Sequence, residues 1–203
     1  MTAPRHATID RATKETQVRL RLALDGEGRG QISTGLPFYD HMLDQLVGHG
    51  LIDLELEAKG DLEVDAHHTV EDVALCLGQA FDEALGDRAG LRRFGSARVP
   101  LDEALAEVTL DFGGRPYCVF DGGPIDARRG ERVGTFPAEL VRHFFQSFSS
   151  RARCAVHVRV LYGDDLHHCI EAAFKAFARA CREATEADPR RQGVASTKGT
   201  LSA

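Results

Sequence analysis

The stretch HHTVED at residues 67–72 decides the fold, because it returns as HHCIEA at residues 167–172. Both copies contain the pattern His-His-x-x-Glu, although the chain has only nine His among its 203 residues. At that frequency the pattern is expected by chance about 0.03 times in a chain of this length. Its two occurrences therefore indicate an internal duplication.

The sequence around the two motifs is duplicated as well. His41 and His143 precede them at equivalent positions, and the apolar alternation through Leu54 corresponds to that through Val156. Each copy predicts a strand, a helix, a second strand and a second helix. We therefore expect an α+β fold of two tandem strand–helix–strand–helix halves, with the helices packed on sheets. The whole of residues 1–203 would form a single unit, with halves at 10–90 and 95–187 and a C-terminal tail at 188–203.

Individual elements follow from the spacing of the apolar residues. Residues 16–24 and 105–112 alternate apolar and polar side chains, which predicts half-buried strands. From Pro37 the apolar residues follow helical spacing, and Pro suits the first position of a helix. We expect residues 87–104 to connect the two halves and GEGRG at residues 26–30 to form a turn.

The composition excludes several classes of protein. The net charge is −6 and the sequence pI about 5.8, so no nucleic-acid partner is expected, because phosphate binding requires a basic surface. No run of about 20 apolar residues predicts a membrane span, and the N-terminus has no secretory signal. The five Cys are odd in number and form no Cys-x-x-Cys pair, which is typical of reduced, buried thiols. We therefore expect a cytoplasmic protein without a membrane partner.

The duplicated histidines predict metal binding. On a helix, His67 and Glu71 are four residues apart and share a face, whereas the adjacent His67 and His68 point about 100° apart. Adjacent imidazoles are therefore expected to bind two different ions. An even division of the candidates gives two sites, each with three His and one Glu. The candidates are His41, His67, His68, Glu71, His143, His167, His168 and Glu171.

Imidazole and carboxylate ligands without thiolates suit Mn, Fe, Co, Ni or Zn. Asp40, Asp44 and Asp72 stand next to candidate ligands, and we expect them to orient imidazole N–H groups. Three cations stand beside Gly or hydroxyl residues, a setting that can hold a phosphate. These cations are Arg93, Arg115 and Lys198. The residues by themselves predict a duplicated protein with two metal sites that binds an anion.

At these motifs the chain resembles the imidazoleglycerol-phosphate dehydratase family. The resemblance covers almost the whole chain, and its order is that of the family. Two positions depart from the family pattern, Tyr39 and Asp165, and neither is a candidate ligand. The matching stretches are PFYDHMLDQL (37–46), DAHHTVEDVALCLGQA (65–80), LRRFG (91–95), PLDEALAE (100–107), ELVRHFFQSF (139–148), HHCIEAAFKAFARA (167–180) and ASTKG (195–199).

The resemblance implies a duplicated fold like domain 2 of ribosomal protein S5, in a homo-oligomer of 24 subunits with active sites between subunits. It also implies a lyase of histidine biosynthesis that dehydrates D-erythro-imidazole glycerol phosphate to imidazole acetol phosphate. Two Mn²⁺ ions per active site would bind the substrate imidazole as an imidazolate. The single unit of residues 1–203 would then be catalytic.

The resemblance also implies roles for individual residues. The eight His and Glu candidates fall at the family's metal ligands. The positions that contact the small phosphate substrate correspond to Glu15, Arg93, Arg115, Ser196 and Lys198. A positioned carboxylate is expected to move the proton, for which the candidates are Glu171, Glu15 and Asp102.

Two other classes of function fit part of this pattern. A dinuclear metallohydrolase also pairs two metals, but it would favour bridging carboxylates over a ligand set dominated by His. A metal-storage or metal-stabilised assembly protein would need no phosphate-binding cations. Turnover of imidazole glycerol phosphate distinguishes the lyase from both.

Overall fold

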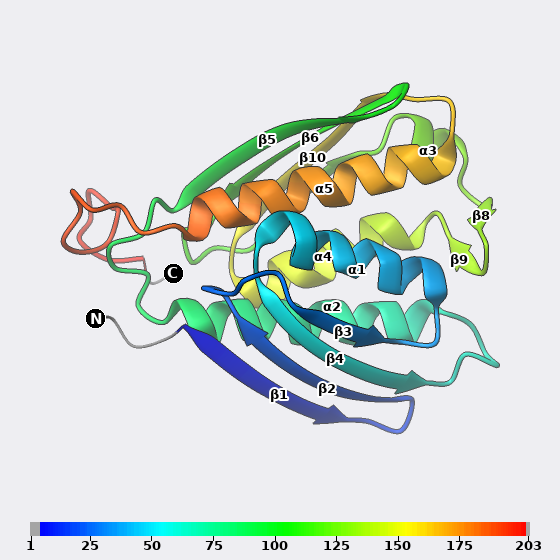
Figure 1. Cartoon of the computed structure of the whole chain (residues 1–203), viewed down its shortest axis with the longest axis horizontal. Helices are drawn as coiled ribbons and strands as arrows, with labels where there is room; N and C mark the ends of the chain where they lie inside the picture. The colour runs from blue at the N-terminus through cyan, green and yellow to red at the C-terminus, as the bar shows by residue number, and fades with distance from the viewer. Residues whose placement is uncertain (1–4, 202–203) are drawn as a thin grey trace.

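A computed structural model describes residues 5–201 of the chain. Two four-stranded sheets form its outer layers, and the long helices lie between them (Figure 1). The first half contains β1 (His6–Ala12), β2 (Thr16–Ala23), β3 (Gly30–Ser33), α1 (Pro37–Gly50), β4 (Asp53–Gly60) and α2 (His67–Leu85). The second half contains β5 (Phe94–Leu101), β6 (Ala104–Asp111), β7 (Tyr117–Asp121), α3 (Pro124–Ala127), β8 (Arg132–Val133), β9 (Phe136–Pro137), α4 (Leu140–Ala152), β10 (Ala155–Tyr162) and α5 (Leu166–Thr185).

The two sheets are copies of each other. Their strand orders are β1-β2-β4-β3 and β5-β6-β10-β7, with two antiparallel pairings and one parallel pairing in each. The registers also correspond, because Leu22 lies opposite Leu54 in the first sheet and Leu110 lies opposite Val156 in the second. The predicted α+β fold with two similar halves is therefore confirmed.

Each half has more strands than its sequence predicts. Three strands precede the first helix, and β5 lies inside residues 87–104, which we expected to be only a connection. The edge strands β1 and β5 bury few large apolar side chains; in β5 the most buried position is Gly95. Their sequences therefore lack the clear alternation that identifies β2. Residues 26–29 of the GEGRG segment lie in the loop before β3, as expected, and the last residue, Gly30, begins that strand.

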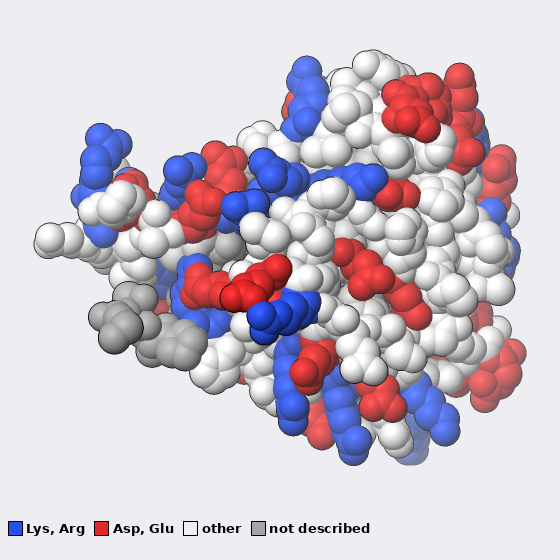
Figure 2. All heavy atoms as spheres, in the orientation of Figure 1, with Lys and Arg blue, Asp and Glu red and all other residues white. Residues whose placement is uncertain are grey.

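The sheets face solvent on their outer sides. In β2 the side chains of Val18 and Leu20 are buried, whereas Arg19 and Arg21 point outward and pair with acidic neighbours. The distance from Arg21 Nη1 to Glu55 Oε2 is 3.4 Å. Figure 2 shows basic and acidic side chains intermingled over the face it draws. The apolar sides of both sheets are thereby left for the helices.

The helices are exchanged between the halves. Helix α2 covers the first sheet and α5 covers the second, but α1 packs against α5 and α4 packs against α2 (Figure 1). The approach of α4 to α2 is close, since a Cβ atom on Gly78 would lie 2.5 Å from the carbonyl oxygen of Phe148. Apart from the four-residue α3, which has no counterpart in the first half, the first helix of each half therefore lies beside the second helix of the other half.

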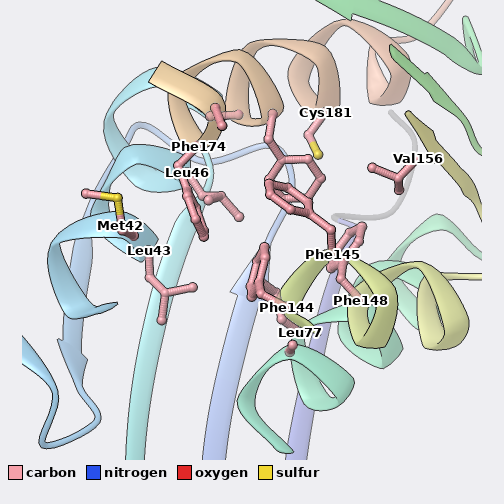
Figure 3. Close-up of a cluster of buried hydrophobic side chains, with 14 of the residues drawn as sticks. Met42, Leu43, Leu46, Leu77, Phe144, Phe145, Phe148, Val156, Phe174 and Cys181 are labelled. Carbon is pink, nitrogen blue, oxygen red and sulfur yellow. The ribbon is translucent and has the colours of Figure 1, made fainter. Parts of the chain in front are cut away.

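Aromatic side chains fill the centre between the helices (Figure 3). Phe144 of α4 lies 4.8 Å from Phe174 of α5 between ring centroids, and Phe148 lies 4.9 Å from Phe177. All four side chains are fully buried. Such pairs contribute about 0.5–1.5 kcal/mol each beyond their burial, so they hold the two helices in one relative position. None of the helices in residues 5–201 is long and apolar enough to cross a membrane.

Candidate metal centre

Helices α1 and α5 together carry the first group of candidate ligands. His41 lies on α1, and His167 and Glu171 lie one turn apart at the beginning of α5. Glu171 Oε2 is 3.2 Å from His41 Nε2 and 3.0 Å from His167 Nε2. The ring of Phe38 packs edge-on against His167, with the centroids 4.9 Å apart. We call His41, His167 and Glu171 the α1–α5 cluster.

Helices α2 and α4 carry an equivalent group. His67 and Glu71 lie at the beginning of α2, and His143 lies on α4. The rings of His67 and His143 are 4.3 Å apart, and His143 Nε2 is 3.4 Å from Glu71 Oε1. This Nε2 atom is buried and has no hydrogen-bond partner in the described part of the chain. We call His67, Glu71 and His143 the α2–α4 cluster.

The exchange of helices explains both clusters. Each takes one His from the first helix of one half and a His with a Glu from the second helix of the other half. The spacing of four residues in His67/Glu71 and His167/Glu171 puts each pair on one helix face. Within each cluster one ligand atom per residue lies within 4.8 Å of the others, which is close enough for a shared metal ion.

The clusters favour the protonation states that bind metal. Burial raises the pKa of Glu171, but hydrogen bonds from Lys175, His41 and His167 outweigh it and leave the pKa below its ordinary value. The pKa of His143 lies below its ordinary value, mainly because the side chain is partly buried and also because His67 is close to it. An ionised carboxylate and a neutral imidazole are the forms that coordinate metal ions.

Lys175 is a neighbour that the sequence interpretation missed. Its Nζ atom lies 2.7 Å from Glu171 Oε1, and its side chain is largely buried. The signal was present, since the two residues are four apart on a helix. The equivalent neighbour of Glu71 is Leu75, so the two clusters carry different charge.

The remaining two candidate ligands lie outside both clusters. His68 Nδ1 is 3.0 Å from Asp61 Oδ2, and His168 Nδ1 is 2.8 Å from Glu103 Oε2. The pKa values of His68 and His168 lie above their ordinary value, mainly because of these hydrogen bonds. One chain therefore brings together six of the eight candidates and turns His68 and His168 toward other partners.

The residues expected to orient the imidazoles are not the ones that do so. Asp40 accepts hydrogen bonds from the backbone and side chain of Thr34, and Asp72 pairs with Arg11. Asp44 forms no hydrogen bond with an imidazole among the described residues. These expectations were wrong: Asp40 adjoins His41 and points away from it by about 100°, and Asp72 is engaged by Arg11 and Thr16. The carboxylates that contact an imidazole Nδ1 outside the clusters are instead Asp61, in a loop, and Glu103, in the turn between β5 and β6.

The two departures from the family pattern leave the local structure intact. The Asp165 carboxylate accepts a hydrogen bond from the backbone N–H of His167 at 2.7 Å and caps the N-terminus of α5. Tyr39 is fully buried, and its hydroxyl lies 3.3 Å from the carbonyl oxygen of Val70.

The candidate phosphate-binding residues gather around the C-terminal segment. The Arg93 guanidinium donates to Asp111 at 2.6 and 2.9 Å and also to the carbonyl oxygen of Ala195. The half-buried Ser196 and the exposed Lys198 follow, and the Lys198 N–H donates to Ser196 Oγ at 3.1 Å. Arg115 lies in the exposed loop before β7, and a side chain on its neighbour Gly114 would collide with Leu201 in the same segment.

These phosphate candidates lie far from the metal clusters of the same chain. The Arg93 N–H donates to the carbonyl oxygen of Ala184, in the last turn of α5, whereas His167 lies in its first turn. At 1.5 Å per residue, about 25 Å of helix separates the two ends. Figure 1 shows the C-terminal segment next to the C-terminal end of α5, whereas His167 belongs to the first turn of this helix. One chain therefore does not bring the two groups into a single pocket.

The candidates for proton transfer lie at three places. Glu171 belongs to the α1–α5 cluster, where Lys175 and two imidazoles surround it. Glu15 lies in the turn between β1 and β2, more than half exposed, with Oε1 3.9 Å from His68 Nε2. Asp102 lies in the exposed turn between β5 and β6 with a positive φ of 46°.

The fold and the two clusters define a duplicated α+β protein whose His and Glu side chains form two candidate metal sites. The imidazoleglycerol-phosphate dehydratase family model matches residues 34–181. The proteins of that name from Kineococcus radiotolerans and Geobacter metallireducens are 57% and 53% identical to this chain, over 97% of it and 99% of their own length. The chain belongs to the imidazoleglycerol-phosphate dehydratase family, and its enzyme class is that of the hydro-lyases.

Solved structures agree with this assignment. The imidazoleglycerol-phosphate dehydratase of Staphylococcus aureus superposes with a TM-score of 0.79 at 35% identity, covering 90% of this chain and 99% of its own. The enzyme from Pyrococcus furiosus, solved in complex with (S)-C348, superposes with a TM-score of 0.77 at 31% identity. The match covers 95% of this chain and 99% of that one. Family membership favours the lyase over the metallohydrolase and metal-storage alternatives.

Proposed function

We propose that the protein dehydrates imidazole glycerol phosphate to imidazole acetol phosphate in the biosynthesis of histidine, in the cytoplasm. The observation that carries this proposal is the pair of equivalent His/Glu clusters in a chain of this family. We take residues 1–203 as one catalytic unit made of halves 10–90 and 95–187 with the tail 188–203.

Each cluster offers three ligands, and His68 and His168 of neighbouring copies would complete them to three His and one Glu. The residues fit a divalent ion, because the donors are imidazoles and carboxylates and because the buried His143 Nε2 lacks a partner. We propose Mn²⁺ as this ion, with two ions per active site. Two bound Mn²⁺ ions would supply Lewis acidity to both nitrogens of the substrate ring and hold it as an imidazolate.

The active site would form between copies of the chain. The metal clusters and the phosphate candidates lie about 25 Å apart along α5, whereas one small substrate must contact both. A neighbouring copy that supplies the second group solves this problem, and it can also supply His68 or His168. We propose a closed homo-oligomer of 24 copies, in which every chain contributes to several sites.

The proton would be moved by Glu15. Glu171 is engaged by Lys175 and two imidazoles, which leaves it to serve as a ligand. Glu15 is exposed beside the outward-facing nitrogen of His68, so it can reach a substrate held at the metals. The hydroxyl would leave as hydroxide, and Glu15 would accept the proton from the neighbouring carbon and pass it to this hydroxide, so that one water is released. The resulting enol would then become the ketone. Asp102 remains the alternative base.

The phosphate would be held by Arg115, Ser196 and Lys198. Arg93 has two guanidinium contacts with Asp111 and one with the backbone of Ala195. It would therefore position the C-terminal segment as well as contribute charge. Cations fixed around the phosphate would orient the imidazole ring toward the metals.

Metal removal and restoration test the proposed reaction. After extensive chelation we expect the protein to lose turnover of imidazole glycerol phosphate, and added Mn²⁺ should restore it. Production of imidazole acetol phosphate is the quantity to measure. Chelated protein that is free of metal and still turns over at the parent rate would disprove the metal-dependent lyase.

Lys198→Ala tests the phosphate site. Losing one charge-assisted hydrogen bond of about 1.5–3 kcal/mol should raise the KM for the substrate roughly 10- to 100-fold. The metal content should stay at the parent value, because Lys198 lies far from the clusters. Lys59→Ala, at an exposed position on β4, is the matched control. An unchanged KM for Lys198→Ala would remove this residue from the site.

A further inference from the structure

Two carboxylates outside the clusters contact His68 and His168 in the same way. Both Asp61 oxygens lie near His68 Nδ1, at 3.2 and 3.0 Å, and Glu103 Oε2 lies 2.8 Å from His168 Nδ1. In each case the carboxylate meets Nδ1 and leaves Nε2 on the far side of the ring. The arrangement occurs once in each half of the chain, which makes it more than an isolated surface contact.

These contacts select one form of each imidazole. A neutral imidazole carries a single N–H, and an ionised carboxylate can only accept a hydrogen bond. The carboxylate therefore places the proton on Nδ1, so that Nε2 keeps its lone pair. A lone pair on Nε2, in a ring whose rotation is restricted, is what a metal ion requires of a His ligand.

Glu103 is itself anchored to the backbone. Its Oε1 accepts hydrogen bonds from the N–H groups of Asp164 and Asp165, at 3.1 and 2.8 Å, while Oε2 faces His168. The turn between β5 and β6 is thereby tied to the loop that begins α5. Asp61, in contrast, has both of its oxygens near His68 Nδ1. Amide substitutions of Asp61 and Glu103 are therefore expected to have different effects.

The two halves use different positions for this contact. The equivalent registers of β2 and β6 put Glu15 and Glu103 at the same position, one residue before the strand. Glu103 contacts the Nδ1 atom of His168, but in the first half Asp61 makes the equivalent contact with His68. Glu15 faces His68 Nε2 instead, at 3.9 Å. In the first half, the carboxylate of Glu15 is therefore not used to hold Nδ1 and faces Nε2, the nitrogen that we expect to bind metal.

We propose that Asp61 and Glu103 are positioning residues, which hold His68 and His168 in the tautomer and orientation that complete the metal sites of a neighbouring copy. The proposal rests on the proposed function, and it adds two residues that are neither ligands nor substrate contacts. Partners of this kind typically change metal affinity 10- to 100-fold.

Glu103→Gln separates positioning from folding. If the Gln oxygen keeps the backbone contacts of Glu103, its NH₂ group faces His168 Nδ1 and forces that nitrogen to accept a hydrogen bond. The imidazole proton then moves to Nε2, where it blocks coordination. We expect the Kd for Mn²⁺, titrated into the chelated full-length protein, to rise about 10-fold or more at one of two sites per chain. At saturating Mn²⁺ turnover should return toward the parent rate.

Asp61 provides the conservative rescue. Asp61→Ala should raise the Kd for Mn²⁺ at one site per chain about 10-fold or more, as for Glu103. Asp61→Asn should stay within about 3-fold of the parent, because its amide can turn its oxygen to His68 Nδ1–H. Glu107→Gln is the matched control for charge, because it removes a carboxylate on β6 that pairs with Arg98 of β5. Thermal unfolding and far-UV circular dichroism check that each variant is folded.

Parent-like Mn²⁺ affinity in folded Glu103→Gln and Asp61→Ala would overturn the proposal, and so would an equal loss in Glu107→Gln. The turnover of the parent tests the proposed function separately. A parent that binds two Mn²⁺ ions per chain without turnover would contradict the lyase, while the comparison of metal affinities would still decide the positioning roles.

Discussion

Replacing His168 by Ala should remove one of two Mn²⁺ ions per chain and lower turnover at least ~10³-fold. The affected site would keep the three residues of one cluster, either the α1–α5 cluster or the α2–α4 cluster. It would lose the fourth of its protein ligands. Metal affinity depends on ligand number and geometry, and the proposed reaction depends on both ions. His68→Ala should have the same effect at the other site.

Metal content by elemental analysis and turnover of imidazole glycerol phosphate are the two measurements for these variants. If the missing ligand comes from a neighbouring copy, light scattering should also detect smaller assemblies, because the ion would no longer bridge two chains. His157→Ala is the control, since His157 is exposed on β10 and lies outside both clusters. Two ions per chain and parent turnover in His68→Ala or His168→Ala would make the eight-ligand scheme wrong.

Glu15→Gln should lower kcat about 10²- to 10⁴-fold, the usual contribution of a general base. The amide keeps the size of the side chain but cannot accept the proton. Metal content should not change, because Glu15 belongs to neither cluster and the Nδ1 atom of His68 is held by Asp61 rather than by Glu15. Steady-state kinetics with metal analysis of the same sample separates a loss of chemistry from a loss of metal.

Glu57→Gln is the matched control, because Glu57 is exposed on β4. This variant should turn over the substrate at the parent rate. Asp102→Asn distinguishes the remaining candidate base. A loss of kcat in Asp102→Asn, with parent kcat in Glu15→Gln, would transfer the proton-transfer role to Asp102. A loss of metal in Glu15→Gln would instead indicate that Glu15 acts through His68.

The parts of the fold that could be predicted are those with a strong local pattern. Helices α1, α2, α4 and α5 each bury an apolar stripe, and β2 alternates buried and exposed residues throughout. The edge strand β5 has Gly95 at its most buried position, so its sequence carries little periodicity. Residues 124–137, with α3, β8 and β9, have no counterpart in the first half.

The candidate ligands could be predicted because His-His-x-x-Glu is both rare and repeated. Their grouping could not, because the exchange of α1 and α4 between the halves depends on contacts far apart in the sequence. The roles of Asp61 and Glu103 depend on loop geometry and strand register, which leave no periodic signal. The distance from Arg93 to the clusters likewise became visible only in three dimensions.

The number of Mn²⁺ ions bound per 203-residue chain decides whether each half of the duplication supports one metal site. The measurement is a titration of chelated parent protein, with the bound metal and the restored turnover followed in one sample. Two ions per chain, with turnover that rises as both sites fill, is the predicted result. One ion per chain, or full turnover before the second ion binds, would contradict a pair of equivalent sites.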